Sequence, residues 1–93
     1  MKPTCFHQNN RSIFNGPFYH CDDCGRIFVR VILEKVDDGL MITAGWKCAF
    51  HALQKEGTIE ISDGETTLIL TKEQDESILA NDHLGKKVNL RLP

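Results

Sequence analysis

The sequence predicts an α+β domain in which a small, cysteine-bearing N-terminal lobe joins a mainly antiparallel sheet with one or two short helices. Its 93 residues suit one domain with a small core, and we expect that single domain over 1–93. Segments with alternating apolar residues are more frequent than segments with helical periodicity. Three of the four cysteines lie within residues 1–28. This placement indicates that residues 1–28 form a lobe stabilised by its cysteines, followed by hairpins and helices over about 29–93.

The first strands are predicted on either side of the second and third cysteines. Residues 18–20 are strand-like, and residues 26–35 alternate in the pattern of a nearly central strand. An Asp-Gly pair at 38–39 predicts a turn that leads into another strand over 40–43. We therefore expect a hairpin directly after the cysteine pair.

A short helix and a second hairpin are predicted next. The helix covers 47–56, and Gly57 ends it because glycine readily takes the left-handed conformation at a helix C-terminus. Residues 58–62 and 66–71 alternate around a turn at 63–64. This pattern predicts two antiparallel strands.

A second helix is predicted from Thr71 to about His83. Thr71 is placed as its N-cap, and Gln74 can reach back to it, as in a capping box. Acidic residues in the first turn suit the helix dipole. Its apolar content is thin, so we expect a peripheral helix, followed by a closing strand over 88–92.

The spacing of Cys21 and Cys24, followed by Gly25, indicates a metal site. Two thiolates at C-x-x-C spacing can hold one tetrahedral Zn²⁺ ion. Glycine allows the tight left-handed turn whose backbone N–H groups point at the sulfur atoms. A redox pair normally opens a helix after a strand, whereas this pair lies between two strand-like segments. We therefore favour zinc over a redox dithiol or inert thiols.

Cys5 and His7 are the first of two pairs that can complete a four-ligand zinc site with Cys21 and Cys24. Residues 5–28 resemble zinc ribbons of small bacterial and phage proteins, in which C-x-H precedes an aromatic residue, C-x-x-C-G and an apolar strand. The resemblance covers about a quarter of the chain. It implies a structural zinc site and no particular reaction, as in accessory proteins of phages and mobile elements.

Cys48 and His51 are the alternative pair, on the first turn of the predicted helix. At i and i+3 they share one helix face. With Cys21 and Cys24 they resemble a treble-clef finger over 21–51, although treble clefs most often have a second cysteine in place of the histidine. A cysteine among apolar helix residues is often a small core residue, whereas Cys5 has no evident packing role. We therefore favour the N-terminal pair.

These features favour a binding protein over an enzyme. Zinc held by four cysteine or histidine ligands has no open position for a substrate, and the zinc-deaminase and H-E-x-x-H signatures are absent. We expect a non-catalytic zinc protein that acts as a protein-interaction module or accessory regulator. The alternative is a nucleic-acid-binding zinc-ribbon regulator, but the net charge of −2 and the lack of Lys/Arg runs count against it.

We expect a cytoplasmic protein with no membrane segment. No apolar run reaches the roughly 18 residues of a membrane span, and the first residues lack a secretory signal pattern. Arg11, Arg26 and Arg30 can form a small basic patch, although ordinary solvated surface is more frequent. We expect a cluster of aromatic residues to form a mini-core near the ligands: Phe6, Phe14, Phe18, Tyr19 and Phe28.

Overall fold

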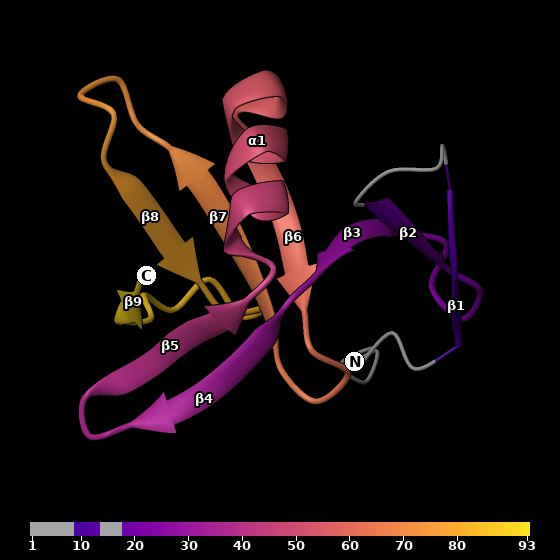
Figure 1. Ribbon diagram of the computed structural model, residues 1–93, viewed down its shortest axis with the longest axis horizontal. Helices are drawn as coiled ribbons and strands as arrows, with labels where there is room; N and C mark the ends of the chain where they lie inside the picture. The colour runs from indigo at the N-terminus through magenta and orange to yellow at the C-terminus, as the bar shows by residue number, and fades with distance from the viewer. Residues whose placement is uncertain (1–8, 14–17) are drawn as a thin grey trace.

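The computed structural model describes residues 9–13 and 18–93, and strands dominate this part of the chain. The strands are β1 (Asn10–Ser12), β2 (Phe18–Cys21), β3 (Ile27–Arg30), β4 (Ile32–Val36), β5 (Gly39–Ala44), β6 (Thr58–Ser62), β7 (Thr67–Lys72), β8 (Ile78–Asn81) and β9 (Leu90–Arg91). Helix α1 (Trp46–Glu56) lies between β5 and β6 in the sequence. Figure 1 shows α1 beside β6 and β7, with β1 and β2 at the opposite end of the sheet from β8.

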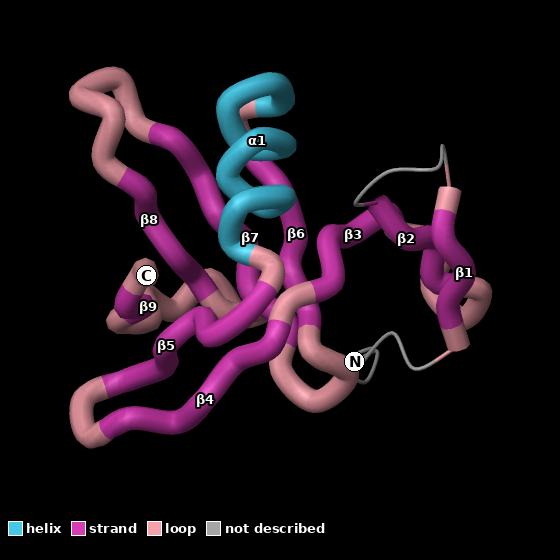
Figure 2. The backbone as a smooth tube through the Cα atoms, in the orientation of Figure 1, coloured by secondary structure: helices cyan, strands magenta, loops and turns pink. Residues whose placement is uncertain are grey.

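The strands form two sheets, which Figure 2 shows as magenta segments. The larger sheet has the order β1-β2-β3-β6-β7-β8, and the smaller one has the order β4-β5-β9. Neighbouring strands are antiparallel, except that β3 is parallel to β6 and β5 is parallel to β9. Each parallel pair joins segments that are far apart in the sequence.

Val31 is the point at which the chain passes from the larger sheet to the smaller one. Its backbone N–H donates to the carbonyl oxygen of Ser62 at 3.1 Å, and β4 begins at the next residue. Gly45 has a φ of +87°, and a Cβ at this position would lie 2.8 Å from the Arg30 carbonyl oxygen. The close approach and the left-handed conformation together require glycine here.

One hydrophobic core unites both sheets and the helix. Val29, Ile61 and Leu68 lie in register across β3, β6 and β7, and Leu53 of α1 belongs to the same buried cluster. The buried members of the cluster are Val29, Val31, Ile42, Ala49, Ala52, Leu53, Ile59, Ile61, Leu68, Leu70 and Ala80. The helix therefore packs on the larger sheet, while Ile42 brings the smaller sheet into the same core.

The predicted α+β fold class with a separate zinc-ribbon lobe is wrong. In the described residues, strands far exceed the single helix, and no zinc ribbon is seen. β2 pairs with β3, and β3 pairs with β6, so the N-terminal strands continue the main sheet. Burial of Val29 beside Ile61 draws this part of the chain into the core sheet, which explains why no separate lobe forms.

The second predicted helix is also wrong. Thr71 pairs with Leu79 and Lys72 pairs with Ile78, so the segment forms the β7–β8 hairpin. A helix here would bury few apolar groups, whereas strand pairing satisfies the backbone and buries Ala80. The first predicted helix and the hairpin of β6 and β7 are confirmed, while the closing strand is limited to β9.

Candidate functional site

The two cysteines of the C-x-x-C motif lie on a tight loop between β2 and β3. We call residues 21–25 the knuckle turn. The Cys21 N–H donates to the Arg26 carbonyl oxygen, and the Gly25 N–H donates to the Cys21 carbonyl oxygen, both at 2.9 Å. Gly25 has a φ of +76°, which favours glycine. Cys21 is fully buried, and Cys24 is exposed.

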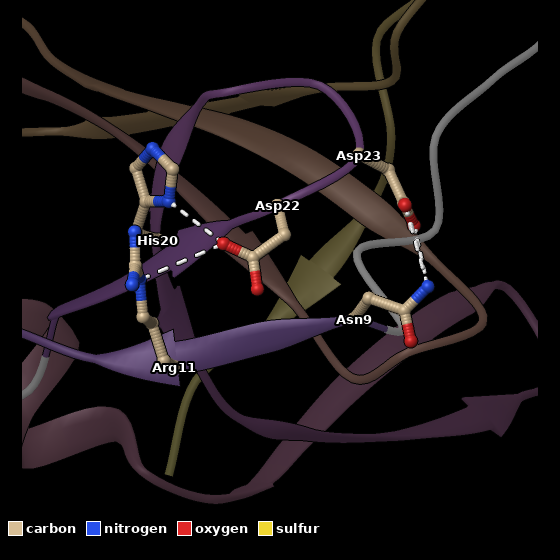
Figure 3. Close-up of polar contacts among 5 residues, drawn as sticks. All are labelled: Asn9, Arg11, His20, Asp22 and Asp23. Carbon is tan, nitrogen blue, oxygen red and sulfur yellow. Dashed lines mark hydrogen bonds and ion pairs between the residues drawn. The ribbon is translucent and has the colours of Figure 1, made fainter.

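The two aspartates between the cysteines are tied to the neighbouring strand β1 and the residue before it, as Figure 3 shows. The Asn9 side-chain amide donates to both carboxylate oxygens of Asp23, at 3.1 and 3.3 Å. The Asp22 carboxylate lies 3.5 Å from Arg11 Nε and 3.5 Å from His20 Nδ1. The Asp22 backbone N–H also donates to the Asn9 carbonyl oxygen at 2.7 Å. These contacts hold the knuckle turn against β1.

The three pairs of predicted metal ligands differ in where the structure places them. Cys21 and Cys24 share the knuckle turn, whereas Cys5 and His7 lie outside the described residues. Cys48 and His51 are exposed on α1, which packs against β6, β7 and β3. Within 9–13 and 18–93, no three His, Cys, Asp or Glu side chains are close enough together to hold a metal. The structure therefore does not bring the alternative pair to the knuckle turn.

The donor chemistry of the knuckle turn fits half of a tetrahedral zinc site. It presents two soft thiol ligands from one constrained turn, the arrangement that C-x-x-C zinc sites use. His20 is directed to Asp22, and its Nδ1 is buried without a hydrogen bond in the described structure. A tetrahedral zinc ion at this turn would need two further ligands from another segment.

The expected basic patch is not a free cationic surface. Arg11 lies beside Asp22, and Arg26 Nη1 lies 3.2 Å from the Glu60 carboxylate. Arg30 lies over the Tyr19 ring, 5.2 Å from its centroid. Within the expected aromatic mini-core, Phe28 is buried and packs against the half-buried Tyr19. Phe6 and Phe14 lie outside the described residues.

A pocket of about 510 Å³ opens between the beginnings of β3 and β6. We call it the β3–β6 pocket. Its described lining is mainly apolar and includes two acidic residues from the end of α1 and from β6. The described lining residues are Phe18, Ile27, Phe28, Glu56, Thr58, Ile59, Glu60 and Ile69.

The sequence analysis missed Glu60 and the pocket. In the alternating pattern of β6, Glu60 occupies a position that is expected to face water, yet it is 8% exposed. Its ion pair with Arg26 joins the residue that follows the knuckle turn to β6. The sequence gives little indication of the Arg26–Glu60 ion pair, because this contact depends on the parallel pairing of β3 with β6, which are distant in the sequence.

A scan against protein-family models finds no match, and searches of curated proteins and of solved structures find none either. In the part of the chain that the structure describes, no helix has the length and apolar character needed to cross a membrane.

Proposed function

We propose that this chain is a small, non-catalytic zinc protein that acts as a protein-interaction module. The observation that carries the proposal is the knuckle turn, which presents Cys21 and Cys24 from one hydrogen-bonded loop. Cys5 and His7 are proposed as the other two ligands. Thiolate ligands suit a reducing, cytoplasmic location, where cysteines serve metal binding more often than disulfides.

Zinc is proposed to have a structural role. When bound, it supplies folding energy, since four protein ligands leave no open position for a substrate. Residues between the cysteines already hold the turn through Asn9 and Arg11. A ligand pair from the N-terminal segment would fix that segment to the same turn.

A protein partner is favoured over nucleic acid. The arginines nearest the knuckle turn are engaged by carboxylates or by an aromatic ring. The pocket beside the turn presents the exposed carboxylate of Glu56, which repels phosphates. Binding of duplex DNA at physiological salt, with a steep salt dependence, would instead support the nucleic-acid alternative.

The ligand set is tested by two matched substitutions, Cys5→Ser and Cys48→Ser. We expect Cys5→Ser to lose zinc, because it removes one of the proposed thiolate ligands. Cys48→Ser should keep one zinc per chain, since this exposed residue lies on α1 and away from the knuckle turn. Native mass spectrometry reads the zinc content of each variant directly. The opposite pattern would assign the site to Cys48 and His51, and a wild-type chain without zinc would overturn the proposal.

A further inference from the structure

The β3–β6 pocket exists because two parallel strands separate toward their beginnings. Val29 pairs with Ile61 and Arg30 pairs with Ser62, and the pairing extends no further. β3 begins at Ile27, earlier than this paired region, and Figure 1 shows its beginning on the side of β2 and its end beside β6. The pocket therefore results from the short parallel pairing of β3 with β6.

The walls of the pocket combine apolar surface with an exposed rim. Ile27 and Ile59 both contribute to the lining, and Phe18 adds an aromatic side chain. Ile27 is 49% exposed, although a large aliphatic side chain gains free energy when it is covered. A ligand that covers Ile27 must extend from the pocket onto the surface.

The ionisable groups among the described lining residues are both acidic. Glu60 is engaged by Arg26. Glu56 is exposed, and no ion pair joins it to another residue of the described ranges. It also lies in the last turn of α1, where the helix dipole adds partial negative charge. The rim therefore attracts a cation at Glu56, whereas the charge of Glu60 is balanced by Arg26.

We propose that the β3–β6 pocket docks a partner-protein segment in which an apolar side chain lies next to a lysine or arginine. The apolar side chain packs against Ile27 and Ile59, and the cation lies beside Glu56. This docking role rests on the proposed function as a protein-interaction module, and it specifies the chemistry of the partner. Phosphate-bearing ligands are disfavoured because the exposed Glu56 carboxylate would repel them.

The test begins with a random dodecapeptide library that is panned on the immobilised, zinc-supplemented full chain. We expect the enriched peptides to share an aliphatic or aromatic residue within two positions of a lysine or arginine. The most enriched peptide is then labelled, and its Kd is measured by fluorescence anisotropy. Absence of a consensus, or an acidic consensus, would overturn the inference.

Matched variants locate the binding site. Ile27→Asp should weaken binding by about tenfold or more, and Glu56→Gln by about threefold, because they remove the apolar contact and the charge. Ile32→Asp and Glu34→Gln change exposed residues of β4 outside the pocket lining and should leave Kd within about twofold. Equal effects of the Ile27 and Ile32 substitutions would refute the assignment. Backbone amide spectra of the free variants confirm that each is folded.

Zinc content, measured on the same samples, separates this inference from the proposed function. Selective binding by a chain without zinc would reject the proposed metal site and support the pocket. A zinc-loaded chain that selects no apolar and basic peptide would reject the pocket alone.

Discussion

Single aspartates define the turns of the C-terminal half. Asp75 accepts hydrogen bonds from the Ser77 hydroxyl at 2.6 Å and from the Ser77 N–H at 3.1 Å. Asp82 accepts from the backbone N–H groups of Lys86 at 2.8 Å and Leu84 at 2.9 Å. These bonds favour the carboxylate form and hold the pKa of both aspartates below the ordinary value.

The lowered pKa of Asp82 predicts an acid-sensitive contribution to stability. With a folded-state pKa below that of the unfolded chain, the carboxylate stabilises the fold above the unfolded value of about 3.9. This contribution is lost as the pH falls through the folded-state pKa. We expect Asp82→Asn to melt at a lower temperature than wild type at pH 7, with the two midpoints converging on acidification.

Thermal unfolding of wild type and Asp82→Asn between pH 7 and pH 2 measures this difference. Comparing the two proteins at each pH removes effects that they share, such as the titration of other groups. A difference in midpoint that stays constant with pH would show that ionisation of Asp82 is not responsible.

Among the elements, the sequence predicted those with strong local signals. Helix α1 ends before Gly57, whose N–H donates to the Leu53 carbonyl oxygen at 2.8 Å. Thr71 and Gln74 match a capping box and predict a helix start at the end of β7, where the structure has the β7–β8 hairpin. Pairing of Thr71 with Leu79 outweighs that local preference. Strand pairing with β7 thus determined the secondary structure of the segment that was predicted as the second helix, where the apolar pattern was weak.

The β4–β5 turn is held by a segment far along the chain. The Asn89 side-chain amide donates to the Asp38 carbonyl oxygen at 3.1 Å and to its carboxylate at 3.0 Å. Arg91 Nη2 lies 3.2 Å from the same carboxylate, and the Leu40 N–H donates to the Asn89 carbonyl oxygen at 2.9 Å. These contacts attach β9 to the hairpin.

Gly39→Ala is expected to detach β9 from β5. A Cβ at position 39 would clash with the backbone of Asn89, which cannot rotate away as a flexible side chain could. We expect a loss of about 1–3 kcal/mol in the free energy of unfolding. Urea denaturation measures the loss, and amide hydrogen exchange at Leu40 reports the contact itself.

Asp37→Ala is the control for this experiment because it changes an exposed residue of the same turn. It should leave both the free energy of unfolding and the protection of the Leu40 amide close to wild type. Full protection of Leu40 in Gly39→Ala would contradict the predicted detachment.

In the whole molecule, the passage of the chain through Val31 makes the two sheets depend on one core. The alternation over 26–35 continues without a break, so the sequence contains no local signal for this change of sheet. Local sequence signals also predicted only part of the candidate site. The C-x-x-C-G pattern predicted the tight turn at 21–25. The β3–β6 pocket instead requires strands brought together by long-range pairing.

Leu53→Ala tests the shared core. Leu53 is fully buried in the cluster that includes residues of both sheets. Its truncation should cost about 2–5 kcal/mol through lost burial and cavity formation. Urea unfolding followed by Trp46 fluorescence and by far-ultraviolet circular dichroism should give one coincident transition at a lower midpoint. Two separate transitions would show that the sheets unfold independently.

The two parallel strand pairs also bear on how fast the chain folds. β3 must meet β6 across about thirty residues and β5 must meet β9 across about fifty, whereas the β6–β7 hairpin closes locally. Loop closure of this length costs chain entropy before any contact compensates for it, and proteins rich in such pairings fold in milliseconds to seconds. We therefore expect the joining of β3 to β6 and of β9 to β5 to be late steps of folding. Until β3 meets β6, the knuckle turn would then be part of a local β2–β3 hairpin that has not yet joined the rest of the larger sheet.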